Sequence, residues 1–180
     1  MDMNQDKKLS IIIFGLVMLA LTICALFFAE DVTKRRIIRL GTSSYYVSVP
    51  ISFKEDEVTD EERSRGQVKY YKSDATLLDF DVFQISKNAN DKSNNKSSSL
   101  EDFLKFDTRN LNCTEIITDR RINGVKYVSY RAIQEYDGKN FKTITYIFDD
   151  KTEFLKLLLW LDGDTAEPEA RLIINSLNKR

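Results

Sequence analysis

The carboxylates of this chain are the side chains whose spacing could support chemistry. Asp79 and Asp81 are two residues apart in a segment predicted to be a strand, so both side chains point to one face of the sheet. A carboxylate pair of this kind binds a metal ion or acts as acid and base in an enzyme. The same spacing is typical of the solvated face of a half-buried strand, and the pattern favours this second interpretation.

Two further groups of aspartates occupy predicted turns. They are Asp149-Asp150 and Asp162-Gly163-Asp164. Asp and Gly are expected at such positions because they suit turn conformations, and neither group continues into the spacing of a calcium-binding loop. We therefore interpret both groups as turn residues, with Asp164 capping a helix.

The rest of the composition excludes several classes of site. The chain has no histidine, so it lacks the commonest general base and the commonest ligand of transition metals. Cys113 is the only thiol outside the apolar N-terminal segment, so neither a disulfide within the domain nor a zinc site built on cysteines can form. We predict no catalytic residue, no metal site and no cofactor.

The eight tyrosines are the main candidates for a binding surface. Aromatic rings can line a carbohydrate or peptide groove, but tyrosine is also a common strand residue that keeps its hydroxyl at the surface. The adjacent pairs Tyr45-Tyr46 and Tyr70-Tyr71 send one ring to each side of a sheet, so at most half of the set can share a groove. The structural role is favoured, and the candidates for a ligand or partner surface are Tyr45, Tyr70, Tyr127 and Tyr130.

The elements that must position these residues are predicted from hydrophobic periodicity and turn signals. Asn123-Gly124 and Asp137-Gly138 are hairpin signals that imply an antiparallel meander. Helices are expected after caps at Thr59, Ser99 and Asp164 or Thr165. The polar run of residues 87–99 is expected to be a surface loop. Strands are predicted over residues 45–53, 68–72, 77–86, 114–120, 125–135, 141–148 and 154–161.

The predicted strand over residues 154–161 is apolar on both faces apart from Lys156. A strand of this kind is usually central in a sheet whose two sides are both covered, so helices are expected on each face. Leu157 and Trp160 are an odd number of residues apart and are predicted to be buried on opposite faces.

The N-terminal segment of residues 9–29 is uncharged and almost wholly apolar. About 21 residues in a helix span about 31 Å, which matches the hydrocarbon core of a bilayer. The segment is longer than the apolar region of a cleaved leader and lacks a small-residue cleavage pattern at its end, so we predict a single-pass signal anchor. It follows a short tail of residues 1–8 and precedes a basic juxtamembrane linker of residues 30–36, before one domain of residues 37–180.

Cys24 within this segment admits a second interpretation. The sequence Leu21-Thr22-Ile23-Cys24 resembles the motif at which bacterial lipoproteins are cut and lipidated, except that Ile23 stands where the motif has Gly, Ala or Ser. A small apolar residue inside a membrane helix is the favoured interpretation. Either reading tethers the domain to the same membrane.

The charges around the anchor leave its orientation open. Basic residues follow the segment at Lys34, Arg35, Arg36 and Arg39, where they are candidates for contact with lipid headgroups. Read literally, the positive-inside rule places the domain in the cytoplasm, but Lys7 and Lys8 also precede the helix. The net charge of −1 gives no electrostatic footprint for nucleic acid, so no nucleic-acid partner is expected.

The order of elements resembles that of PsbP-like domains. The resemblance covers most of residues 37–180 and is one of spacing and hydrophobic pattern, without a diagnostic catalytic motif. It rests on Tyr46-Val47-Ser48-Val49-Pro50, Leu78-Asp79-Phe80-Asp81-Val82, Ser99-Leu100-Glu101-Asp102-Phe103, Ile122-Asn123-Gly124, the strand over 143–148, Phe154-Leu155-Lys156-Leu157 and the closing amphipathic helix.

The resemblance implies an α+β fold in which helices flank an antiparallel sheet, and a binding or assembly role without catalysis. Many PsbP-like proteins of bacteria are tethered to the cell surface, which favours an extracytoplasmic domain on the cell membrane. The resulting hypothesis is a non-catalytic module with an unidentified protein or cell-envelope ligand as its partner. The alternatives are a metal-dependent or acid–base enzyme that uses the surface aspartates, and a regulatory domain that faces the cytoplasm.

Overall fold

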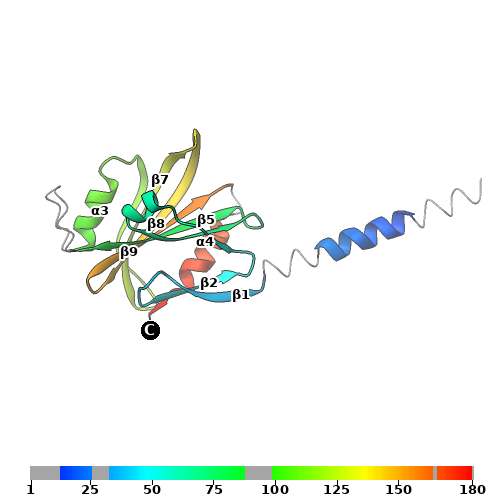
Figure 1. Ribbon diagram of the computed structural model, residues 1–180, viewed down its shortest axis with the longest axis horizontal. Helices are drawn as coiled ribbons and strands as arrows, with labels where there is room; N and C mark the ends of the chain where they lie inside the picture. Colours follow the sequence, from blue (N-terminus) through cyan, green and yellow to red (C-terminus); the bar gives the residue numbers. More distant parts are fainter. Residues whose placement is uncertain (1–12, 26–32, 88–98, 164–165, 180) are drawn as a thin grey trace, which may run out of the picture.

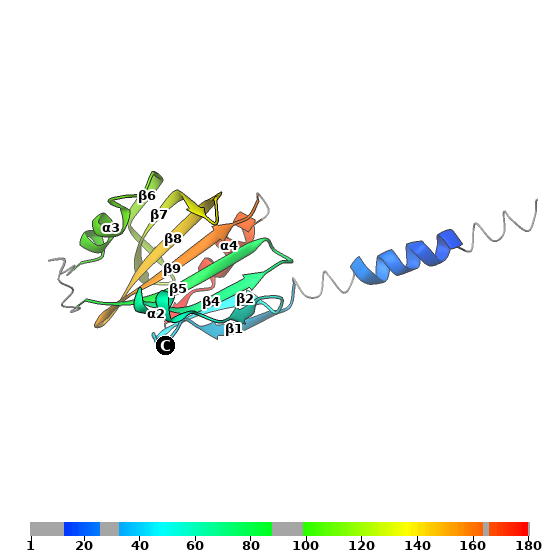
Figure 2. The ribbon, with the colours of Figure 1, turned by 45° about the horizontal axis from the view of Figure 1, so that its top comes forward.

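The computed structural model describes residues 13–25, 33–87, 99–163 and 166–179. Its core is an α+β domain with a seven-stranded antiparallel sheet in the order β3-β4-β5-β9-β8-β7-β6 and a three-stranded antiparallel sheet in the order β1-β2-β10 (Figures 1 and 2). The strands of the large sheet are β3 (Lys54–Asp56), β4 (Gln67–Ser73), β5 (Leu78–Ser86), β6 (Cys113–Ile122), β7 (Val125–Tyr136), β8 (Lys139–Asp150) and β9 (Glu153–Leu161). Those of the small sheet are β1 (Arg35–Arg39), β2 (Tyr45–Pro50) and β10 (Asn178–Lys179).

The two predicted hairpins are confirmed. Asn123 and Gly124 join β6 to β7 with φ values of +49° and +82°, and Asp137 and Gly138 join β7 to β8 with φ values of +49° and +71°. Two consecutive residues with positive φ form the type I′ turn, whose twist matches that of the strands it connects. The long strands from β6 to β9 therefore form the expected meander.

The first two helices of the described domain begin one residue after their predicted caps, whereas the cap predicted at Asp164 or Thr165 lies outside the described residues. In α2 (Asp60–Ser64), Thr59 and Glu62 form a complete capping box. In α3 (Leu100–Thr108), the Ser99 hydroxyl accepts a hydrogen bond from the backbone N–H of Asp102. The third helix, α4 (Ala166–Asn175), has Pro168 in its first turn, where a missing N–H is tolerated.

The large sheet has a different apolar cluster on each face. On one face, the odd-numbered residues of β9, among them Leu157, pack with the small sheet and with Ile173 and Ile174 of α4. On the other face, Phe154 of β9 packs with Phe103 and the neighbouring apolar residues of α3. The central strand β9 lies between β5 and β8, as predicted, and α4 and α3 mark the two sides of the sheet.

The second face is covered over only part of the length of β9. Leu157 has no exposed surface, whereas Trp160 is half-buried, so the prediction that both are buried is wrong for Trp160. The reason is length: the nine residues of α3 span about 14 Å as a helix, whereas the nine residues of β9 span about 30 Å as a strand. The helix covers the Phe154 end of β9 and leaves the Trp160 end to other side chains.

The N-terminal predictions fall partly outside the described residues. Residues 13–25 are helical, and the ends of the predicted anchor, 9–12 and 26–29, are not described. The described part of the chain contains no helix with the length and apolarity needed to cross a membrane. Strand β1 begins at Arg35, so the last two residues of the predicted linker belong to the small sheet. Residues 88–98 of the predicted surface loop also lie outside the described residues.

Candidate functional site

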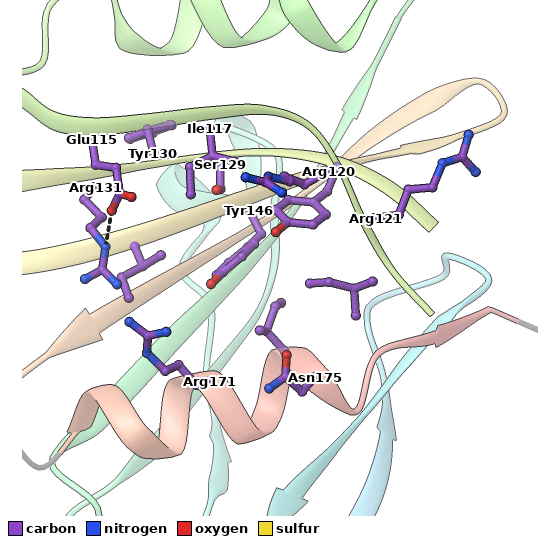
Figure 3. Close-up of a pocket in the computed structure, with 14 residues that line it drawn as sticks. Glu115, Ile117, Arg120, Arg121, Ser129, Tyr130, Arg131, Tyr146, Arg171 and Asn175 are labelled. Carbon is purple, nitrogen blue, oxygen red and sulfur yellow. Dashed lines mark ion pairs between the residues drawn. The ribbon is translucent and has the colours of Figure 1, made fainter. Parts of the chain in front are cut away.

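A pocket of about 490 Å³ opens between α4 and the strands β6, β7 and β8 (Figure 3). It combines apolar walls with convergent polar groups, which is the usual character of a binding site. We call it the arginine pocket. Its polar lining residues are Arg120, Arg121, Arg131, Arg171, Glu115, Ser129 and Asn175, and the others are Ile117, Ile122, Ile144, Ile174, Tyr127, Tyr130 and Tyr146.

An irregularity in β6 decides which of its side chains face this pocket. Ile117 pairs with Ser129 and the next pair is Arg120 with Tyr127, so β6 contains one extra residue between the two pairs. Asp119 lies in this bulge with a φ of +56°. A bulge shifts the alternation of the strand by one residue. As a result Arg120, and not Asp119, shares the pocket face with Ile117.

The turn of the β6–β7 hairpin is fastened to the end of α4. Asn123 Nδ2 donates hydrogen bonds to the backbone oxygens of Asn175 at 3.1 Å and of Leu177 at 2.7 Å. These carbonyls lie at the C-terminal end of the helix, where backbone oxygens lack partners within the helix. The two bonds hold the strand wall of the arginine pocket against its helical wall.

Two of the four arginines are engaged by carboxylates. Arg131 lies 2.8 Å from Glu115 and 2.8 Å from Glu167 of α4, and Glu167 also lies 2.8 Å from Arg171. The guanidinium groups of Arg131 and Arg171 lower the pKa of Glu167 to about 2. Glu167 therefore stays ionised at any physiological pH and bridges the strand wall to the helix.

The other two arginines have no carboxylate partner among the described residues. Arg121 donates a hydrogen bond of 3.1 Å to the backbone oxygen of Gly124, and no ion pair of the described residues involves Arg120. Both residues are exposed. Arg121 pairs with Lys126 across the strands, on the face opposite to Arg120, and its side chain points away from the pocket (Figure 3). The guanidinium groups of Arg120, Arg131 and Arg171 against the carboxylates of Glu115 and Glu167 therefore leave one positive charge in excess.

The floor of the pocket carries aromatic rings and a hydroxyl. The rings of Tyr127 and Tyr146 lie 5.6 Å apart, and burial raises the pKa of Tyr146, so its hydroxyl remains protonated. The side chain of Ser129 faces the pocket in Figure 3. Hydroxyl donors and guanidinium groups together can bind an anion, since both donate hydrogen bonds to it. The lining holds no histidine and no thiol that could activate Ser129 or serve as a nucleophile.

The predicted carboxylate pair lies on the opposite face of the sheet, beside the end of β9 that α3 does not reach. Asp79 and Asp81 do share this face, but Asp81 is only 7% exposed, so the prediction of a solvated strand face is wrong for Asp81. The reason is its neighbours: Gln67 Nε2 donates to one oxygen of Asp81 at 2.7 Å, and Trp160 Nε1 donates to the other at 2.6 Å. Burial raises the pKa of Asp81 to about 6.

Asp79 is also held by protein donors. It accepts hydrogen bonds from the hydroxyl of Tyr70 at 2.8 Å and from the backbone N–H of Ser73 at 3.3 Å. No cluster of three metal-ligating side chains occurs in the part of the chain that the structure describes. Both aspartates of β5 are thus hydrogen-bonded within the fold, Asp81 to Gln67 and Trp160 and Asp79 to Tyr70 and Ser73.

The four candidate tyrosines do not form one groove. Tyr127 lines the arginine pocket, whereas the ring of Tyr130 packs in the α3 cluster on the other face of the sheet, where its hydroxyl donates to Asp107 at 2.7 Å. Tyr45 is 1% exposed in the core, where its hydroxyl donates to the backbone oxygen of Asp149 at 2.6 Å. Tyr70 lies on the opposite face of the sheet beside Asp79.

The basic residues predicted to contact lipid headgroups are largely engaged by the domain. Arg35 pairs with Glu169 of α4 at 2.8 Å, and Arg36 donates to the backbone oxygen of Phe53 at 2.7 Å. Arg39 donates to the backbone oxygens of Thr42 and Ser43 at 2.5 and 2.7 Å. Lys34 precedes β1 and is exposed. These contacts order the first strand of the small sheet.

Sequence reasoning missed the arginines of the pocket. Their positions are 120, 121, 131 and 171, three in a predicted hairpin and one in the last helix. The only local signal is the spacing of Glu167 and Arg171, which places them on one side of a helix. Nothing in the sequence indicates that this helix side faces the hairpin, because that depends on how the sheet curves around α4.

Comparison with known proteins relates the fold to solved structures. No protein-family model matches the sequence, and no curated protein matches it. The structure is similar to cyanobacterial PsbP (CyanoP) from Synechocystis sp., with 9% identity, a TM-score of 0.57, and coverage of 81% of this chain and 92% of that one. It is also similar to a protein from Bacteroides thetaiotaomicron, with 13% identity, a TM-score of 0.51 and coverage of 79% of this chain. This chain spans about half, 49%, of the length of the Bacteroides protein. The domain therefore has the PsbP-like fold that the sequence pattern predicted.

Proposed function

We propose that this chain is a non-catalytic binding module that takes its ligand in the arginine pocket. The observation that carries the proposal is the charge of that pocket, because Arg120 faces it without a carboxylate partner among the described residues. Convergent polar groups beside apolar walls are the usual character of a ligand pocket. The lining supplies hydrogen-bond donors but no paired nucleophile and base, which supports binding without catalysis.

The module is further proposed to be held at the cell membrane, with its domain outside the cytoplasm. Support comes from the apolar run of residues 9–29, which has the length of a bilayer-spanning helix. The charged polypeptide that follows begins its folded domain at β1, close behind the proposed anchor. A tether of this length keeps the arginine pocket near the membrane surface, where an envelope component or a membrane-protein partner is within reach.

Binding in the pocket can be tested with a substitution that fills it. Ile117 is half-buried on the pocket wall, whereas the adjacent Ile116 is 53% exposed and points to the other side of the edge strand β6. The full-length protein would be purified from its own membranes in mild detergent and weighed by native mass spectrometry. We expect a non-covalent ligand on the wild type and on Ile116→Trp, and none on Ile117→Trp. Equal occupancy of the two variants, or an empty wild type, would contradict the proposal.

The orientation is tested separately. Protease added to intact cells is expected to remove the domain, since the proposal places it outside the membrane. Protection of the domain until the membrane is permeabilised would instead place it in the cytoplasm. An immunoblot against the C-terminal residues, with a cytoplasmic protein as control for cell integrity, distinguishes the two results.

A further inference from the structure

We infer that the ligand of the arginine pocket is an organic monoanion, in which one singly charged oxyanion group is joined to an apolar body. The inference rests on the proposed function, since it names the class of ligand that the same pocket would bind. It draws on three features of the pocket: hydroxyl groups that lack a protein partner, a single positive charge in excess, and apolar walls.

The hydroxyl groups indicate where the charged group of the ligand would bind. Ser129 is only 4% exposed, and no hydrogen bond among the described residues involves its hydroxyl or those of Tyr127 and Tyr146. Ser129 pairs with Tyr146 of β8, and Tyr127 lies two residues before Ser129 on the same face, about 7 Å away along the strand. A hydroxyl shielded from water regains a hydrogen bond when a ligand accepts one from it.

One guanidinium group stands beside these hydroxyls without a carboxylate. Arg120 pairs with Tyr127 across the strands and therefore shares the pocket face with it. The other two guanidinium groups of the pocket are balanced by the carboxylates of Glu115 and Glu167, so the charge of Arg120 alone is in excess. Arginine keeps its charge at any physiological pH, and its N–H donors match the oxygens of an anion. One negative charge neutralises Arg120, and a second would have no free cation to meet.

The volume and the apolar lining define the rest of the ligand. A pocket of about 490 Å³ falls in the range of pockets for small organic molecules and is far larger than one inorganic anion needs. Ile117, Ile144 and Ile174 line it from the strands and the helix, and the ring pair of Tyr127 and Tyr146 completes the wall. An inorganic anion would leave this apolar surface uncovered, so an apolar body is expected beside the charged group.

Small aromatic probes separate these requirements in calorimetric titrations of the full-length protein in detergent at neutral pH. Benzoate and benzenesulfonate each carry one charge on the same ring. Benzamide has the ring without the charge, acetate has the charge without the ring, and phthalate has a second carboxylate on the ring.

Benzoate or benzenesulfonate is expected to bind at least about tenfold more tightly than benzamide and acetate, as for the loss of one charge-assisted contact or of the apolar contact. Phthalate is expected to bind no more tightly than the better monoanion. The preferred monoanion tells a planar carboxylate from a tetrahedral group of the kind that sulfonates and phosphodiesters share. Equal affinity for benzamide or acetate, about tenfold tighter binding of phthalate, or no binding of either monoanion would overturn the inference.

Two adjacent arginines of β6 provide matched variants that locate the binding. Arg120→Gln removes the guanidinium on the pocket face, and Arg121→Gln removes one that points away from the pocket, with the same change in net charge (Figure 3). Arg120→Gln is expected to weaken the binding of the better monoanion by about tenfold or more, and Arg121→Gln by less than about twofold.

A second variant tests the buried hydroxyl. Ser129→Ala keeps the charge of the pocket and removes a donor that has no partner among the described residues, so it is expected to weaken the same binding by about threefold to tenfold. Equal losses in the two arginine variants, or full affinity in both Arg120→Gln and Ser129→Ala, would contradict the inference.

The failure of this inference can be told from the failure of the proposed function. A ligand that native mass spectrometry finds on the wild type and not on Ile117→Trp, in a protein that binds neither monoanion, would keep the binding module and reject the monoanion. An empty pocket in both measurements would reject both.

Discussion

The two faces of the large sheet differ in whether their charged side chains have partners within the fold. On the α4 face, the arginine pocket holds the guanidinium groups of Arg120, Arg131 and Arg171, of which Arg120 has no carboxylate partner among the described residues. On the other face, each oxygen of Asp81 accepts a hydrogen bond from a protein donor. A charge whose partners are all supplied by the fold is structural, whereas a charge left without them in a pocket is available to a ligand.

The pKa values of the carboxylates reflect the same difference. Two neighbouring arginines lower the pKa of Glu167 to about 2 at the pocket, because they stabilise its charged form. Burial raises the pKa of Asp81 to about 6 on the other face, because its two neutral donors offset only part of the cost of removing the charge from water. The four predictions below test whether the two faces differ in this way.

The largest effect is expected from the apolar layer beneath the pocket. Leu157 has no exposed surface on the α4 face, so Leu157→Ala is expected to lower the free energy of unfolding by about 2 to 5 kcal/mol. Trp160 on the other face is half-buried, and its replacement by alanine leaves one oxygen of Asp81 without a donor, at a cost of about 1 to 3 kcal/mol.

Urea unfolding of a fragment that begins at residue 33, and so keeps β1 intact, measures both changes. A silent Trp160→Ala, within about 0.5 kcal/mol, would show that the acidic face is ordinary solvated surface. Such a result would mean that the hydrogen bonds of Asp81 do not distinguish this face from the rest of the surface.

The second prediction concerns pH. Asp81 has a pKa of about 6 in the fold, above the ordinary value of 3.8 for an aspartate, so the folded state holds the proton more tightly than the unfolded state. Stability linked to this group is therefore present below about pH 4 and is lost as the pH rises through about 6. A difference of about two pKa units corresponds to about 3 kcal/mol between these limits.

Asp81→Asn removes this component and Asp79→Asn, the matched control, keeps it. Urea unfolding from pH 4 to pH 7 is expected to show a difference between wild type and Asp81→Asn that falls by about 3 kcal/mol as the pH rises. A difference that stays constant over this range would mean that Asp81 is as well solvated as an ordinary surface carboxylate.

Much of this architecture was predictable from the sequence, because it depends on local signals. The positive φ values of Asn123 and Asp137 follow from the Asn-Gly and Asp-Gly turns, and the cap at Ser99 from its polar side chain before an apolar stripe. The central position of β9 followed from its apolar residues on both faces.

The chemistry of the two faces was not predictable because it depends on contacts between distant segments. Asp81 is buried by Gln67 and Trp160, which are 14 and 79 residues away. Arg120 faces the pocket only because a bulge at Asp119 shifts the alternation of β6, and no residue pattern marks that bulge. The regular alternation of side chains along a strand would have placed Asp119, and not Arg120, on the pocket face.

The third prediction tests how the pocket is closed. Asn123 and Asp137 occupy equivalent positions of two type I′ turns, so replacing either by alanine imposes the same strain at positive φ. Only Asn123 also bonds to the backbone at the end of α4. Asn123→Ala is therefore expected to be less stable than Asp137→Ala by about 1 to 2 kcal/mol, the net value of two hydrogen bonds. Equal losses in urea unfolding would mean that the hairpin does not depend on α4 for its position.

The smallest expected effect is that of Glu167 on the affinity of the arginine pocket for an anion. Glu167 occupies donors of both Arg131 and Arg171, so it competes with any anion in the arginine pocket. Glu167→Gln keeps the shape of the side chain and removes its charge. The affinity for benzoate is then expected to rise by about threefold at low ionic strength and by less in about 0.5 M salt, as for a partly exposed charge pair of less than 1 kcal/mol. Glu61→Gln, which removes the partner of Arg65 on α2, is expected to leave that affinity unchanged. A gain at Glu61 equal to that at Glu167 would indicate a general effect of net charge, since Glu167 contacts arginines that line the pocket and Glu61 does not.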